Sequence, residues 1–194
     1  MELTELAEIR NWTLAVLAIT GAVITIRTFR NNNQQRKLDN TFKTLEYLRK
    51  HIGEEQIERF IELFQANNPI TSQPNEFKLP DGQVQYVEDM FSEGGCGNGE
   101  IYNMIQVFDL VARSLNKKLL KTELIWYEYG QMISKCYEWT SQMEEMDKEQ
   151  FPSLSETDQK FIKKYDSFYH HLNKFMKKND DLMIGPTKMY TDIE

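Results

Sequence analysis

The chain has 194 residues and a formal net charge of −7, with a pI near 5.1. This length fits one membrane anchor and one helical domain and argues against a second globular domain. The acidic balance argues against a general affinity for nucleic acid through the phosphate backbone. Its two cysteines, Cys96 and Cys136, have neither metal-ligand nor redox spacing, so we expect ordinary thiols in a reducing compartment and no disulfide.

The first expected element is a helix that crosses a membrane. Residues 12–26, WTLAVLAITGAVITI, contain no charged side chain, and Arg10 and Arg27 close the run. As a helix this core is about 22 Å long, short of the roughly 30 Å hydrocarbon thickness, but apolar flanks extend it and the arginines can snorkel. A run this short also fits a helix buried in a soluble core. We favour the membrane because a cationic cluster follows the run directly.

The charges around the anchor predict its orientation. The cations that follow the span are Arg27, Arg30, Arg36 and Lys37, against Arg10 alone before it. This asymmetry places the N-terminus outside and the bulk of the protein in the cytoplasm. Glutamates stand where a cleaved signal peptide would carry basic residues, so residues 1–30 are expected to remain as the N-terminal segment and transmembrane helix.

Two faces can be distinguished on the anchor. Small residues recur at alternating steps of three and four, which would let neighbouring helices approach closely. This small-residue seam consists of Ala15, Ala18, Ala22 and Thr25. A more polar stripe on another face is a candidate pore lining, and it consists of Thr13, Thr20, Ile24, Arg27 and Asn31. The alternative for any single threonine is a hydrogen bond back to its own helix backbone.

The anchor is expected to continue as a juxtamembrane helical extension over residues 31–53. No glycine or proline interrupts residues 28–52, and Gly53 is expected to end the helix. The apolar face predicted to pack on the soluble domain consists of Leu38, Phe42, Leu45, Leu48 and Ile52. The amides of residues 31–35 form either a solvated face or, in a ring of copies, polar rings below a membrane opening. The neighbouring cations could instead bind anionic lipid headgroups.

Residues 54–178 are expected to form an all-α cytoplasmic bundle. Apolar periodicity predicts helices over 57–64, 101–115 and 118–139, the last two as an antiparallel hairpin that turns near Asn116. A polar connection after the first of these runs to Pro80, and a short helix is expected over 83–91. No segment alternates at strand period for long enough to predict a sheet.

The C-terminal part is expected to end in one long helix. Ser155 and Asp158 resemble a capping box after Pro152, and the apolar face that follows reaches Met176. The tail, 179–194, is expected to be irregular or clamped on a neighbouring subunit. The glycine-rich residues 94–99 lack the Lys-Ser/Thr ending and the preceding strand of a phosphate-binding loop, so we assign them no nucleotide role.

Signals of catalysis are thin. The histidines are His51, His170 and His171, and local spacing builds no Ser-His-Asp, metal-ligand or paired-carboxylate site. No catalytic residue, cofactor, metal or small-molecule substrate is therefore expected. The best lead to an enzyme is KKYDSFYHH at residues 163–171, where a lysine precedes the histidine pair on the last helix.

A helical domain with such a segment resembles the HEPN class of helical nucleases and their relatives, whose signature is an arginine followed after a few residues by a histidine. Here Lys163 or Lys164 takes the place of the arginine. A lysine holds phosphate only as a point charge, so this exchange is not conservative. We therefore favour a solvated or subunit-contacting pair of histidines, His170 and His171, over ribonuclease chemistry.

The span WTLAVLAITGAVITIRTFR, its continuation QQRKLDNTFKTLEYLRK and the later YNMIQVFDLVARSLNKKLLKTELIWYEYGQMISKCYEW resemble a family of bacterial membrane-anchored helical proteins. Within it, the chain looks most like the small membrane accessories encoded beside type VI-B CRISPR effectors, which carry a divergent HEPN-like domain. The resemblance implies a homo-oligomeric ring with a central pore in the bacterial inner membrane, which strengthens antiphage defence by permeabilising or depolarising the cell. It also implies an RNA-guided ribonuclease or its RNA products as partners. The alternatives are a membrane-tethered HEPN-like ribonuclease and a non-catalytic membrane adaptor.

Overall fold

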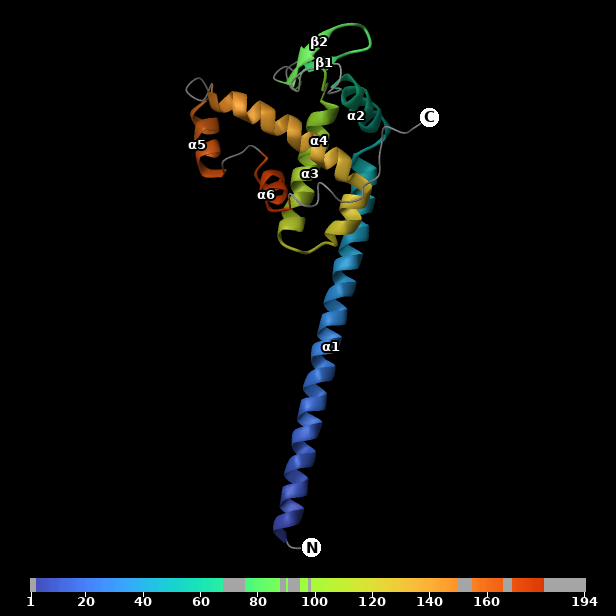
Figure 1. Ribbon diagram of the computed structural model, residues 1–194, viewed down its shortest axis with the longest axis vertical. Helices are drawn as coiled ribbons and strands as arrows, with labels where there is room; N and C mark the ends of the chain where they lie inside the picture. Colours follow the sequence, from blue (N-terminus) through green and yellow to red (C-terminus); the bar gives the residue numbers. More distant parts are fainter. Residues whose placement is uncertain are drawn as a thin grey trace. The chain divides into compact units, whose positions relative to one another are not determined.

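A computed structural model of the 194-residue chain gives the fold (Figure 1). It describes residues 3–67, 76–87, 90, 95–97, 99–149, 155–165 and 169–179, without the side chains of 3–11, 144–149 and 161–165. The chain divides into two compact units, Met1–Asn40 and Thr41–Glu194. Each unit is described in turn.

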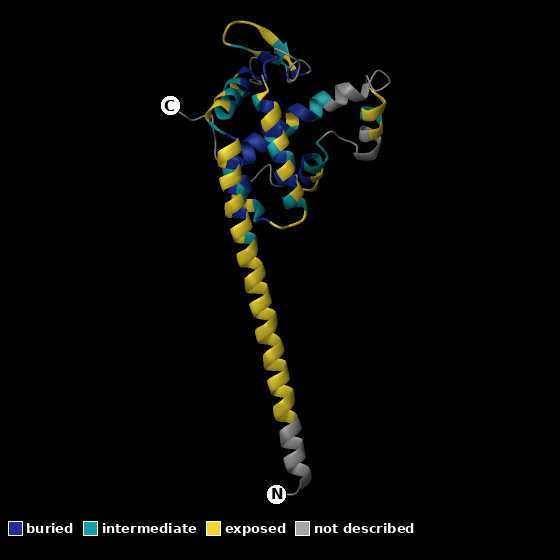
Figure 2. Ribbon diagram, turned by 180° about the vertical axis from the view of Figure 1, so that it is seen from behind, coloured by how far each residue is buried: buried dark blue, intermediate teal, exposed yellow. Residues whose placement is uncertain are grey.

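The described part of the first unit is a single helix. This helix, α1, runs from Leu3 to His51 and therefore ends inside the second unit. Its continuity confirms the prediction of one helix through the juxtamembrane extension. Every residue from Trp12 to Arg36 is exposed (Figure 2), so the apolar run is not buried within the unit to which it belongs.

The second unit is mostly helical, as predicted. Besides the end of α1 it contains α2 (Glu54–Ala66), α3 (Glu100–Asn116), α4 (Thr122–Glu149), α5 (Glu156–Tyr165) and α6 (His170–Lys178). Helices were predicted at the positions of α2, α3 and α4, although α4 continues ten residues beyond the predicted end at 139. Gly53 separates α1 from α2. The Gly53 backbone N–H donates a hydrogen bond to the Gln56 side-chain oxygen at 2.9 Å.

Helices α3 and α4 pack in opposite directions, as the predicted hairpin requires. Phe108 lies edge-on to Tyr129 at 6.3 Å between ring centres, and Met104 lies 3.8 Å from Cys136 between sulfur atoms. An earlier residue of α3 thus pairs with a later residue of α4, which is the pattern of an antiparallel pair of helices. Lys118, in the turn between them, adopts a left-handed backbone with φ of 56°.

Trp139 on α4 is the centre of the core. Its side chain is fully buried, its ring lies 5.8 Å from that of Phe60 and 5.5 Å from that of Phe77, and its indole N–H donates to the Asn67 side-chain oxygen at 3.3 Å. The Asn67 amide donates in turn to the Glu76 carbonyl at 2.7 Å. Because buried indole and amide groups need partners, this arrangement fixes α2 and the first strand against α4.

The two strands correct the sequence-based prediction of an all-helical chain. Strands β1 (Glu76–Lys78) and β2 (Val84–Tyr86) pair antiparallel, so the helix predicted over 83–91 is wrong where the structure describes it. The turn between them contains Gly82 with φ of 85°, and the Asp81 carboxylate accepts from the Gln83 N–H at 2.9 Å. Such an Asp-Gly pair is a hairpin signal, but strands of three residues are too short to alternate detectably.

The prediction of a single long C-terminal helix is also wrong. The capping interaction that was predicted to begin it is present, since the Asp158 N–H donates to the Ser155 hydroxyl oxygen at 3.2 Å. However, α5 ends at Tyr165 and a separate helix, α6, begins at His170. The predicted irregular tail lies outside the described residues from 180 onward, whereas the glycine-rich segment 94–99 is described except at residues 94 and 98.

The apolar face predicted on the second half of α1 is only partly buried. Leu45, Leu48 and Ile52 belong to the core, whereas Phe42 is 57% exposed. Thr41 is buried in its place, and its hydroxyl oxygen accepts a hydrogen bond from the Lys121 N–H at 2.8 Å. This bond joins α1 to the residue that precedes α4.

Candidate membrane segment and polar cluster

The segment of α1 from Trp12 onward is long and apolar enough to cross a membrane, and it is the one helix with these properties among the described residues. Its large apolar side chains are between 44% and 72% exposed: Trp12, Leu14, Val16, Leu17, Ile19, Val23, Ile24, Ile26 and Phe29. Removing a fully exposed side chain of this size from water yields about 1.5–3 kcal/mol. Together these residues forgo on the order of 10 kcal/mol in water, which is comparable to the stability of a whole domain.

The threonine hydroxyls of the span bond within the helix. Thr20 donates to the Val16 carbonyl and Thr25 donates to the Gly21 carbonyl, each at 2.8 Å. The alternative of a bond to the helix's own backbone is therefore observed at both positions. Because the donor is used, such a hydroxyl costs little in lipid, while its oxygen can still accept a hydrogen bond from water.

The polar stripe and the small-residue seam lie on opposite sides of α1. Each helical residue rotates by about 100°, so residues two apart point in nearly opposite directions. Ala22 is two residues from both Thr20 and Ile24, and Thr25 is two residues from Arg27. In a closed ring, the face of a helix that points to the central axis and the face that contacts the neighbouring helix are less than a right angle apart. The stripe and the seam are roughly 180° apart, so one ring cannot use the stripe as its lining and the seam as its subunit contact.

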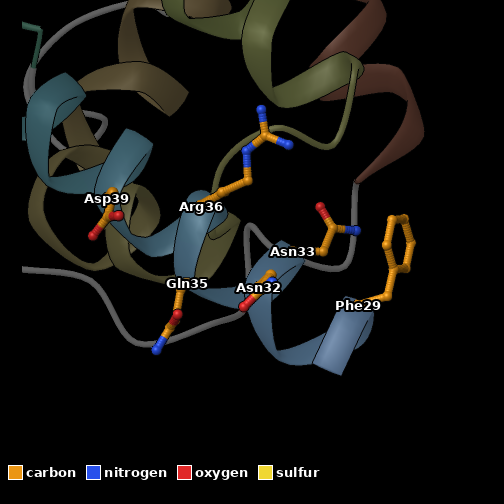
Figure 3. Close-up of a pocket in the computed structure, with 6 residues that line it drawn as sticks. All are labelled: Phe29, Asn32, Asn33, Gln35, Arg36 and Asp39. Atoms are coloured by element: carbon orange, nitrogen blue, oxygen red, sulfur yellow. The ribbon is translucent and has the colours of Figure 1, made fainter. Parts of the chain in front are cut away.

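A hollow of about 380 Å³ lies on α1 beyond the apolar segment (Figure 3). Its lining residues are Phe29, Asn32, Asn33, Gln35, Arg36 and Asp39. Figure 3 shows the Arg36 guanidinium and the Asn33 amide extending to the same side of the helix, while the Asp39 carboxylate points away from Arg36. All six side chains come from three turns of one helix, so the hollow is open at the surface.

A polar cluster joins α3 to the start of α6. The Asp109 carboxylate accepts from the Leu172 N–H at 2.8 Å, and the Asn116 amide donates to the His171 carbonyl at 2.8 Å. Side chains of α3 thus fix the first turn of α6, which has no cap from its own Tyr169.

Burial lowers the pKa of His171, while the neighbouring Asp109 carboxylate opposes this shift. Charge interactions with His170, Arg113 and Lys174 lower this pKa further, which favours the neutral imidazole. The His170 and His171 rings lie edge to face, 5.3 Å apart.

The structure changes the composition of the candidate catalytic group. Lys163 and Lys164 belong to α5, whereas His170 and His171 belong to α6, so the lysines and histidines do not share a helix as predicted. The lysine side chains lie outside the described residues. Arg113 of α3 instead acts electrostatically on His171. Sequence reasoning missed Arg113 and Asp109 because about 60 residues separate them from α6, and local spacing cannot reveal such a pair.

A second hollow, of about 460 Å³, lies in the second unit between the end of α1 and the start of α4. Its lining residues are Phe42, Leu45, Glu46, Arg49, Leu124, Tyr127 and Glu128. Behind it, burial raises the pKa of Tyr129, although Arg49 opposes the shift by charge and by a hydrogen bond. The groove combines exposed aromatic surface with charges of both signs.

The part of the chain that the structure describes contains neither a metal-binding cluster nor a reactive cysteine site. No group of three or more His, Cys, Asp or Glu side chains there could hold a metal ion. Cys96 and Cys136 are both buried and neither forms a disulfide, and burial strongly raises the pKa of the Cys136 thiol. A buried protonated thiol is a poor nucleophile and a poor metal ligand.

Comparison with known proteins assigns no family. No family model matches the chain, and neither the curated proteins nor the solved structures include one similar to it. Function must therefore be inferred from the residues themselves.

Proposed function

We propose that this chain is a single-pass membrane protein whose copies assemble into a ring and permeabilise the bacterial inner membrane. The observation that carries the proposal is the uninterrupted exposure of the apolar part of α1. In water this surface is costly, whereas in lipid it is stabilising and the helix satisfies its own backbone hydrogen bonds. The helical second unit lies in the cytoplasm in this proposal, on the side of the juxtamembrane cations.

Arg27 favours the polar stripe as the lining of the ring. If Trp12 and Phe29 mark the two interfaces, Arg27 lies about 3 Å inside the hydrocarbon. Helical side chains lean toward the helix N-terminus, so this guanidinium leans toward the bilayer centre, against the direction in which it would have to snorkel. An intramembrane cation costs a few kcal/mol unless it faces water or a partner. A water-filled lumen removes this cost.

A pore requires several copies, because one helix encloses no water. With the stripe toward the axis, Asn31 follows Arg27 at the cytoplasmic mouth. The antiphage role and the partnership with an RNA-guided ribonuclease or its RNA products, which the resemblance implies, are part of the same proposal. In that role the ring depolarises an infected cell.

Release of a trapped dye from liposomes containing the purified full-length protein tests the proposal. We expect Thr20→Leu and Arg27→Glu to change the rate of release several-fold, because both side chains would line the lumen. Thr25→Leu is the matched control, since Thr25 makes the same backbone bond as Thr20 on the other face. Equal effects of the two threonine substitutions, or no release by the unaltered protein, would contradict the pore.

The runner-up is a membrane-tethered ribonuclease, and the position of Arg113 favours it over the passive adaptor. With Arg113 beside a neutral His171, the cluster pairs a cation for phosphate with an acid–base group, which Lys163 and Lys164 were expected to supply. RNA cleavage by the detergent-solubilised protein, lost in both Arg113→Ala and His171→Ala but kept in His51→Ala, would establish this reading. A passive membrane adaptor predicts neither leakage nor cleavage.

A further inference from the structure

We infer that the hollow formed by Phe29, Asn32, Asn33 and Arg36 on α1 binds the phosphate of an anionic phospholipid. This inference rests on the proposed membrane insertion of α1. It assigns a lipid ligand to residues on the face of the helix opposite to the polar stripe.

The distribution of charge along the chain favours an anionic ligand here. Residues 27–43 contain five Lys or Arg residues and one Asp, which gives this stretch a charge of +4. Since the whole chain carries −7, the remainder carries −11. A short basic stretch directly after a span, on an otherwise acidic protein, is the pattern that attracts anionic lipid headgroups.

The depth of the hollow matches the lipid phosphates. With Phe29 at the edge of the hydrocarbon, Asn33 lies about 6 Å and Arg36 about 10 Å farther along the helix. The polar headgroup layer is about 5–7 Å thick on each side of the bilayer. Because helical side chains lean toward the N-terminus, the Arg36 and Asn33 side chains reach back toward this layer.

The polar groups of the hollow suit a phosphate. Arg36 is exposed and has no ion-pair partner among the described residues, although Asp39 lies only one turn away. Its guanidinium can donate two parallel hydrogen bonds to phosphate oxygens, and the amides of Asn32 and Asn33 can add neutral donors. Asp39, also in the lining, disfavours an anion, and Figure 3 shows its carboxylate turned away from Arg36.

The apolar neighbours of the hollow suit the rest of the lipid. Phe29 is two residues from both Arg27 and Asn31, so it lies on the side of the small-residue seam. If the polar stripe faces the axis of a ring, this side faces lipid. The small side chains of Ala18 and Ala22 then leave room for an acyl chain along the helix. This chain would run toward the bilayer centre from a phosphate held at Arg36.

Electron paramagnetic resonance with spin-labelled lipids tests the inference. The full-length protein would be reconstituted in phosphatidylcholine bilayers containing a trace of labelled phosphatidylglycerol or labelled phosphatidylcholine. We expect the anionic lipid to associate about fivefold more strongly than the zwitterionic one, the factor expected for one cationic side chain near the surface. Arg36→Gln should remove most of this preference, and Asp39→Asn should increase it.

Lys37→Gln is the matched control, because it removes the same charge at the same depth on another face of α1. If Lys37→Gln reduces the preference as much as Arg36→Gln, or if the unaltered protein shows no preference, the assigned site is wrong. Inorganic phosphate at constant ionic strength should not displace the labelled lipid, and displacement would identify free phosphate as the ligand instead. Dye release from the same membranes separates this test from that of the pore. Leakage without lipid preference overturns only the lipid site, whereas an Arg36-dependent preference without leakage supports the lipid site and overturns the pore.

Discussion

The two units of this chain are stabilised in opposite ways. From Trp12 to Arg36 every residue is exposed, and the hydroxyl groups of Thr20 and Thr25 bond to the backbone of the same helix. In the second unit, Trp139 joins α4 to α2 and β1 through ring contacts and a hydrogen bond. The first unit thus depends on its surroundings for stability, whereas the second unit contains its own core.

The largest expected effect is on the self-contained unit. Trp139→Ala should destabilise it by about 3–5 kcal/mol, because the substitution leaves a cavity and removes the partner of Asn67. Chemical denaturation of the full-length protein in detergent, followed by near-UV circular dichroism, measures this loss. Tyr127→Ala, at a residue that is 55% exposed, should change stability by less than about 0.5 kcal/mol. Similar losses in the two variants would mean that Trp139 is not the centre of the core.

The next effect concerns the unit that we propose to insert into lipid. Ile19→Asp should weaken membrane insertion by about 2.5–3.5 kcal/mol, because it places a charge near the middle of the span. Membrane fractionation of cells that express the full-length protein would show the variant leaving the membrane pellet. Lys43→Asp, at a position beyond the proposed headgroup layer, should leave the protein in the pellet. Unchanged retention of Ile19→Asp would contradict a transmembrane α1.

A smaller effect is expected where α3 fixes α6. Asp109→Ala should destabilise the first turn of α6 by about 0.5–2 kcal/mol, the usual range for loss of a helix N-cap, since the Leu172 N–H loses its acceptor. Hydrogen exchange should accelerate in α6 and remain unchanged in α2. If α6 keeps its protection, the carboxylate is not its cap.

The smallest effect is a dependence on pH. The pKa of His171 is lower in the folded protein than its ordinary value of 6.5, so the unfolded state binds the proton more tightly. The contribution of His171 to the docking of α6 is therefore full above pH 6.5 and declines as the pH falls toward the folded pKa. Hydrogen exchange in α6 at pH 7.5 and 5.5 should show this decline, after correction for intrinsic exchange rates. His171→Gln should reduce the decline, and an unchanged decline would assign it to another group.

The regular helices could be predicted from the sequence because their signals are local. The apolar period of Ile101, Ile105 and Phe108 and the absence of a helix breaker before Gly53 each describe a neighbourhood of a few turns. The hairpin at β1 and β2 was missed because each strand has three residues, although Asp81 and Gly82 carry a turn signal. The start of α6 was missed because it depends on Asp109 and Asn116 from a distant helix.

The candidate site was predictable to a similar degree. Sequence spacing identified a polar stripe and a small-residue seam on α1, but it did not reveal that they compete for the same ring. That conflict follows only when both are placed on one helix. Conversely, Arg113 could not be assigned to His171 until the fold brought α3 and α6 together. The role of Lys163 and Lys164 stays a prediction.

The hydrogen bonds that the Thr20 and Thr25 hydroxyls donate to their own helix have a consequence for insertion and assembly in a cell. Because each donor is satisfied within its own subunit, a solitary copy can reside in the bilayer without penalty from these groups and need not assemble as it inserts. Assembly of the proposed ring is then a separate, concentration-driven event. The number of complete rings in this proposal rises as a high power of copy number, so we expect a modest increase in expression to shift a pool of monomers toward assembled rings.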